Sequence, residues 1–122
     1  MLELSKEQLK KAIKEVWIRS VTEMQPDILS ALRHARDTET SERAKAYLAI
    51  MVENAETAAE KRTVICQDTG IPTFFIRTSL DFPYHDSFRG AFDEAMHELT
   101  MGEFPMRPMV VDPLTREDRC DN

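Results

Sequence analysis

The sequence predicts an α+β fold, in which an N-terminal helical layer is followed by short strands and a further helix. Apolar residues recur at helical spacing through the first sixty positions. After Lys61 and Arg62 the pattern changes to short β-prone runs, and helical spacing returns beyond Pro83. Because no repeat, low-complexity tract or composition shift divides the chain, we expect residues 1–122 to form a single domain.

Three helices are expected in the first part of the chain. Ser5 and Gln8 have the spacing of a capping box at the start of the first helix. Its apolar stripe consists of Leu9, Ala12, Ile13, Val16, Trp17 and Val21. Pro26 suits the first turn of a second helix. The expected buried side of that helix consists of Ile28, Leu29, Leu32 and Ala35.

A polar turn at residues 37–41 supplies the N-cap of the third helix. The expected core face of the third helix consists of Ala44, Tyr47, Leu48, Met51, Ala55 and Ala58. A fourth helix is expected after the loop through Pro83, with a face of Phe88, Ala91, Phe92, Ala95 and Leu99. Three short apolar runs are the strand candidates: Thr63–Cys66, Thr73–Thr78 and Met109–Val111.

Composition excludes several functional classes. Sixteen Lys and Arg against 22 Asp and Glu give a net charge of -6, which disfavours nucleic acid and anionic membranes as partners. No apolar run approaches the roughly 18 residues of a membrane span. Two cysteines, Cys66 and Cys120, are too few for a disulfide framework, so we expect reduced thiols and a cytoplasmic location.

Unusual side chains are concentrated at Cys66–Gly70, with the sequence CQDTG. A cysteine that leaves an apolar run at a polar turn can be a nucleophile or, as a thiolate, a metal ligand. A nucleophile would need a histidine base, and none of His34, His85 and His97 can be placed near Cys66 from the sequence. The alternative is that Cys66 is a small buried apolar residue, and that Asp68 and Thr69 are ordinary turn residues.

A second candidate segment runs from Arg107 to Arg116. Pro108 favours an extended backbone at Arg107, and a guanidinium matches the two oxygens of a carboxylate. The alternative is a surface arginine before a rigid loop. Met96, Met101, Met106 and Met109 are expected to fill the core rather than bind metal.

The segment Val64–Pro72, with the sequence VICQDTGIP, resembles the ICQDTG signature of class I, iron–sulfur fumarate hydratases and of the related L-tartrate dehydratases. A second motif of the same family resembles Arg107-Pro108 together with the segment 111–116 (VDPLTR). The family's helix before the first motif is similar to residues 39–59, including Asn54-Ala55. The likeness covers essentially the whole chain and corresponds to the N-terminal part of the α subunit.

The resemblance implies a lyase with a 4Fe-4S cluster that reversibly dehydrates malate to fumarate, a reaction of the tricarboxylic acid cycle. Three cysteines hold the cluster in this family, and the open iron acts as a Lewis acid on the substrate. Cys66 corresponds to the first ligand. Gln67 and Asp68 correspond to residues that bind the substrate, Asp68 also being the catalytic candidate, and Arg107 corresponds to an arginine that binds a substrate carboxylate.

The resemblance also implies partners. The other two cysteine ligands belong to a C-terminal portion of the α subunit, and a β subunit or domain completes an oligomeric enzyme, so this chain alone is expected to be inactive. Cys120 stands where the family has glycine and is not expected to be a ligand. Two alternatives are an L-tartrate dehydratase α fragment and a non-enzymatic binding or assembly module derived from the family.

Overall fold

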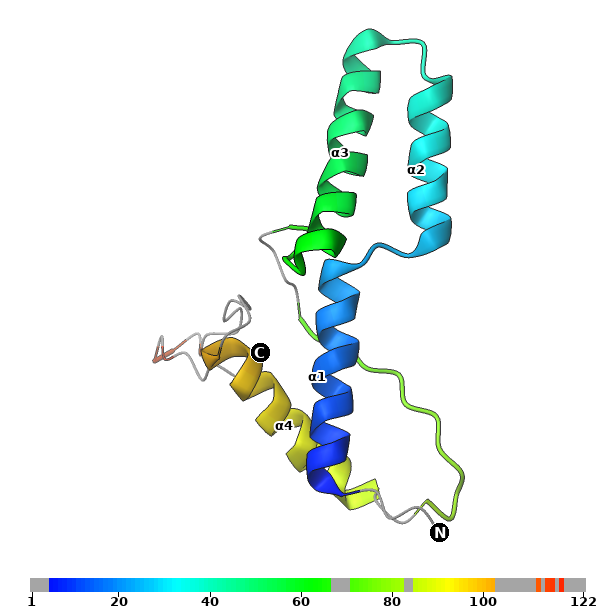
Figure 1. Cartoon of the computed structure of the whole chain (residues 1–122). Helices are drawn as coiled ribbons and strands as arrows, with labels where there is room; N and C mark the ends of the chain where they lie inside the picture. The colour runs from blue at the N-terminus through cyan, green and yellow to red at the C-terminus, as the bar shows by residue number, and fades with distance from the viewer. Residues whose placement is uncertain are drawn as a thin grey trace. The chain divides into compact units, whose positions relative to one another are not determined.

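The computed structural model describes residues 5–66, 71–82, 85–102, 112, 114–115 and 117, with the backbone alone at 85 and 86. Its helices, in chain order, are α1 (Lys6–Thr22), α2 (Pro26–Thr38), α3 (Glu42–Lys61) and α4 (His85–Met101) (Figure 1). These match the four helices that the apolar spacing predicts. The predicted α+β class is wrong, because none of the described residues lies in a β-strand.

The two strand candidates in the described part of the chain fail for the same physical reason. A β-strand needs a neighbouring strand to pair its backbone groups, whereas β-propensity reflects only local preference. Thr63–Cys66 follows α3 without forming a strand and bends at Ile65 and Cys66, and a backbone hydrogen bond joins Ile65 to Val21 in α1. Thr73–Thr78 lies outside any helix or strand. The third candidate, Met109–Val111, lies outside the described residues.

The chain divides into two compact units. The first, which we call the bipartite unit, combines Met1–Trp17 with Asp68–Asn122. The second, the hairpin unit, is the intervening segment Ile18–Gln67. Helix α1 therefore contributes its residues up to Trp17 to the bipartite unit and its remaining residues to the hairpin unit.

Large apolar side chains form the core of the bipartite unit. Its buried residues come from α1 and α4, namely Leu9, Ile13, Trp17, Ala91, Ala95, Met96 and Leu99. The ring of Phe74 joins this core, with centroid distances of 6.4 Å to Trp17 and 4.9 Å to Phe92. The predicted faces of α1 and α4 are thus confirmed in their main members. Ala12, Val16 and Met101 are exposed instead, which corrects the expectation for these three.

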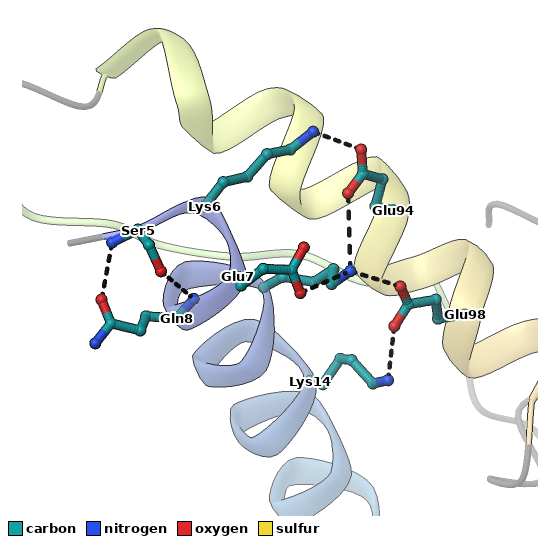
Figure 2. A network of polar contacts seen from close by, with 8 residues as sticks. Ser5, Lys6, Glu7, Gln8, Lys14, Glu94 and Glu98 are labelled. Atoms are coloured by element: carbon teal, nitrogen blue, oxygen red, sulfur yellow. Dashed lines mark hydrogen bonds and ion pairs between the residues drawn. The ribbon is translucent and has the colours of Figure 1, made fainter.

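Ion pairs line the same two helices (Figure 2). Lys10 Nζ lies 2.7 Å from a carboxylate oxygen of Glu98, and Lys14 Nζ lies 2.8 Å from the other. Lys6 pairs with Glu94, which lies one helical turn before Glu98 on α4. At the start of α1, Ser5 N donates to Gln8 Oε1 and Gln8 N donates to Ser5 Oγ, which confirms the predicted capping box.

The hairpin unit is built around α2 and α3, which lie antiparallel and side by side (Figure 1). Pro26 occupies the first turn of α2 and Ser41 caps α3, as predicted. In the connecting loop, Glu39 Oε1 accepts the backbone N–H groups of Thr40 and Ser41, each at 2.8 Å. Across the pair, Arg33 Nη2 lies 2.6 Å from Glu56 Oε1.

Few side chains of α2 and α3 are buried. The buried residues of α3 are Val52, Ala55 and Ala58, and α2 has none. The sequence prediction is therefore wrong for Ile28, Tyr47 and Met51, which are exposed. Helical spacing alone does not separate Met51 from Val52, because Met51 lies four residues before Ala55 and Val52 lies three before it; the structure buries Val52.

None of the described helices is both long enough and apolar enough to cross a membrane.

Candidate functional site

The candidate site begins where α3 ends. Lys61 is the last helical residue, and Arg62 adopts the left-handed conformation, with φ 48° and ψ 47°. The backbone N–H groups of Arg62 and Thr63 both donate to Ala58 O, which satisfies a carbonyl of the last helical turn. This C-terminal cap turns the chain sharply away from the α3 axis and into the segment that carries Cys66.

The backbone of Ile65, immediately before Cys66, is held at both of its polar atoms. Its N–H donates to Val21 O near the end of α1, at 2.9 Å. Its carbonyl oxygen accepts a hydrogen bond from Asn54 Nδ2 of α3, at 2.7 Å. The two successive peptides on either side of Ile65, the second of which leads into Cys66, are therefore each held by a different helix.

The side chain of Cys66 is exposed. The alternative that Cys66 is a small buried apolar residue is therefore wrong. An exposed thiol at a turn with a fixed backbone is accessible to a metal ion or an electrophile. In the described part of the chain, however, no three His, Cys, Asp or Glu side chains gather closely enough to hold a metal ion.

The other predicted site residues, Gln67, Asp68 and Arg107, lie outside the described residues, as does Cys120. His34 and His97 are exposed on α2 and α4. Within the described residues, Cys66 is thus the one predicted site residue whose surroundings are defined.

The VDPLTR segment is described at Asp112, Leu114 and Thr115. Asp112 Oδ1 accepts the backbone N–H groups of Leu114 and Thr115, each at 2.8 Å. Asp112 N donates to Glu117 O, and Glu117 N donates to Thr115 Oγ1. This is an Asx turn, in which a carboxylate organises its own loop. Asp112 therefore has a defined role in shaping its own loop.

Sequence reasoning did not assign a role to Asn54. Its residue type carries a usable signal, because asparagine is a poor helix former that tends to bond to nearby backbone groups. Asn54 stands in the interior of a 20-residue helix, directly before the buried Ala55. An amide side chain next to a buried position of the helix, 11 residues before the bend at Ile65, is a candidate for a hydrogen bond to the chain that follows the helix.

The comparisons with known proteins place the chain in a family. The profile described as fumarate hydratase (Fumerase) matches residues 10–122, so the chain belongs to this family. A protein named "Putative L(+)-tartrate dehydratase subunit alpha" from Methanocaldococcus jannaschii is 35% identical over 94 residues, which cover 75% of this chain and 33% of the relative.

Of two further relatives, one is named a fumarate hydratase and the other a tartrate dehydratase subunit. A "Putative fumarate hydratase class I" from Geobacillus stearothermophilus is 31% identical over 117 residues, which cover 95% of this chain and 22% of the relative. The L(+)-tartrate dehydratase subunit alpha of Escherichia coli K12 is 30% identical over 91 residues, covering 75% and 30%. The chain thus spans about a third or less of the length of the curated relatives that it matches.

Proposed function

We propose that this chain is the N-terminal part of the α subunit of an iron–sulfur hydro-lyase that reversibly dehydrates malate to fumarate. The observation that carries the proposal is the exposed Cys66 thiol on a backbone fixed from two helices, in a chain that belongs to the fumarate hydratase family. In this proposal the 122 residues act as one structural domain of the larger enzyme and are inactive alone.

Cys66 fits the chemistry of a 4Fe-4S cluster ligand. Iron–sulfur clusters bind cysteine thiolates, which must be reachable and held in a defined direction. Cys66 is exposed, and the residue before it is hydrogen-bonded through both backbone polar atoms. When bound, the cluster supplies a Lewis acid for removal of the substrate hydroxyl. The two further thiolates belong to the remaining portion of the α subunit.

The substrate in this proposal is a small dicarboxylate, and the chain contributes three side chains to it. Arg107 binds one carboxylate through two parallel N–H donors, because a guanidinium matches that geometry. Gln67 donates its amide N–H to the substrate hydroxyl or carboxylate. Asp68 accepts a hydrogen bond from the hydroxyl and orients it for departure, which makes it the catalytic candidate. An acidic protein must supply cations locally at such a site, and Arg107 does so.

The partners follow from the same proposal. Relatives are named as α subunits, which supports a β subunit or domain as the complement of the enzyme. We place the assembled oligomer in the cytoplasm, in the malate–fumarate step of the tricarboxylic acid cycle.

L-Tartrate dehydration is the second candidate function. It is favoured by one observation, namely that relatives at 35% and 30% identity are named tartrate dehydratase subunits. The two functions differ only in the substrate, because both are removals of water from a hydroxy-dicarboxylate. Turnover assays of the holoenzyme that contains this sequence, with L-malate and L-tartrate in parallel, decide between them.

The ligand role of Cys66 is tested with Cys66→Ser in that holoenzyme after anaerobic reconstitution. Because a hydroxyl is a much poorer iron ligand than a thiolate, we expect iron and acid-labile sulfide to fall to background, with loss of the absorbance near 400 nm. Cys120→Ser is the matched control and should retain the cluster. Full iron content in Cys66→Ser would overturn the proposed function.

A further inference from the structure

Asn54 stands out among the polar residues that the proposed chemistry does not use. Its amide nitrogen donates to Ile65 O at 2.7 Å, across 11 residues of sequence, although its side chain is exposed. Other exposed side-chain bonds of α3 differ from it: Glu56 pairs with a side chain of α2, and Ser41 caps its own helix. Asn54 instead holds the backbone of the segment that follows the helix.

The peptide that Asn54 holds is the one that joins Ile65 to Cys66. A peptide unit is planar, so its carbonyl oxygen, its nitrogen and both flanking Cα atoms lie in one plane. A donor on Ile65 O therefore orients the plane that contains the Cys66 nitrogen and Cα. The bond from Ile65 N–H to Val21 O fixes the preceding peptide in the same way. Little backbone freedom remains before the Cys66 side chain.

We propose that Asn54 is a positioning residue for Cys66: by holding the Ile65 carbonyl it sets the direction in which the Cys66 thiolate reaches a metal cluster. This rests on the proposed ligand role of Cys66. Partners that orient a metal ligand change metal affinity by about 10–100-fold when they are removed. Asn54 acts through the backbone of the ligand and does not touch the metal.

The first test uses the 122-residue chain and hydrogen exchange of the Ile65 amide. Asn54→Leu removes the donor while favouring the helix, because leucine has a higher helix propensity than asparagine. We expect Ile65 to exchange about fivefold faster, as suits the loss of one hydrogen bond. Asn54→Gln, which keeps an amide donor, should recover part of the protection. Unchanged exchange in Asn54→Leu would overturn the positioning role.

The second test measures cluster retention in the holoenzyme that contains this sequence. Loss of iron to a chelator should be about 10–100-fold faster in Asn54→Leu than in the wild type, with partial rescue in Asn54→Gln. Glu53→Leu is the matched control, because Glu53 is the exposed residue beside Asn54 on the same helix, and among the described residues Asn54, not Glu53, donates to Ile65 O. It should lose iron at the wild-type rate.

Two comparison variants separate the possible outcomes. Val52→Ala removes a buried side chain from the same helix and leaves the Asn54 donor to the Ile65 carbonyl in place. If Val52→Ala accelerates iron loss as much as Asn54→Leu does, the role of Asn54 is only structural and the inference fails. If Cys66→Ser loses the cluster while Asn54→Leu retains it at the wild-type rate, the inference fails and the proposed function stands. If Cys66→Ser itself retains the cluster, the proposed function fails.

Discussion

The bipartite unit and the hairpin unit contain helices of similar length but are stabilised by different contacts. The bipartite unit buries Trp17, Met96 and Leu99 between α1 and α4, with the ring of Phe74 against Trp17. In α3 of the hairpin unit only Val52 and two alanines are buried, while Tyr47 and other large apolar side chains are exposed. The bipartite unit thus buries several large apolar side chains, whereas the buried positions of α3 in the hairpin unit are mostly small.

This difference matters for the candidate site, because Cys66 belongs to the hairpin unit. Its segment is held by hydrogen bonds to Val21 and Asn54 and by the cap at the end of α3. Hydrogen bonds have directional geometry, whereas apolar packing of small side chains does not specify direction. A unit with little core can therefore still hold one peptide in a defined orientation.

The largest expected effect is in the core of the bipartite unit. Leu99→Ala should lower the free energy of unfolding by about 3 kcal/mol, because it removes a side chain that is 2% exposed and leaves a cavity. Urea unfolding of the chain, followed by circular dichroism, measures the loss. Leu80→Ala is the matched control, because Leu80 is fully exposed, and it should change stability by less than about 0.5 kcal/mol.

The counterpart in the hairpin unit is Val52→Ala, at a residue that is 1% exposed. It should cost about 2 kcal/mol, because two methyl-sized groups are lost from a small core. A loss at Val52 larger than that at Leu99 would contradict the difference in burial between the two units.

A smaller effect is expected in the loop between α2 and α3. Glu39→Ala removes the acceptor of two backbone N–H groups, at Thr40 and Ser41, and should cost about 1 kcal/mol. Glu39→Gln keeps an oxygen acceptor at the same reach and should recover most of the stability in the same urea titration. Equal losses in the two variants would show that the charge, and not the pair of hydrogen bonds, organises this loop.

The smallest effect concerns the ion pairs between α1 and α4. Hydrogen bonds from Lys10 and then Lys14 lower the pKa of Glu98 from its ordinary 4.5 to about 2. Because the folded-state pKa is the lower one, the stabilisation is present above pH 4.5 and is lost as the pH falls toward 2. These side chains are partly exposed, so the contribution is modest and weakens with salt.

Urea midpoints between pH 5.5 and 2.5, at low and high salt, measure this contribution. Glu98→Gln should flatten the acid limb of the stability curve, whereas Glu53→Gln, at an exposed carboxylate outside the network, should leave it unchanged. An acid limb of wild-type slope in Glu98→Gln would show that these ion pairs add nothing to the stability of the bipartite unit.

Local features of the fold were predictable because their causes are local. The capping box at Ser5 and Gln8, the proline at the start of α2 and the serine cap of α3 depend on residues within one helical turn. The strands were not predictable in this way. The runs Thr63–Cys66 and Thr73–Thr78 have β-prone residues, but pairing depends on a neighbouring strand, and the described residues provide none.

In the candidate site, too, the features with local causes were predictable and those that depend on distant residues were not. The sequence identified Cys66 as a residue of interest through its polar, glycine-containing surroundings and its resemblance to a family to which the chain proves to belong. It did not decide whether the thiol is buried or exposed, and it gave Asn54 no role. Both depend on contacts between residues that are distant in the sequence, such as Val21 with Ile65.

The sequence by itself thus determined the four helices, three of their start signals and the family, because periodicity, capping and motifs are properties of neighbouring residues. Only the tertiary structure decided that the β-prone runs remain outside any strand, that Val52 rather than Met51 is buried, and that Cys66 is exposed. Each of these depends on which surfaces meet once the chain has folded, and a one-dimensional pattern does not specify that.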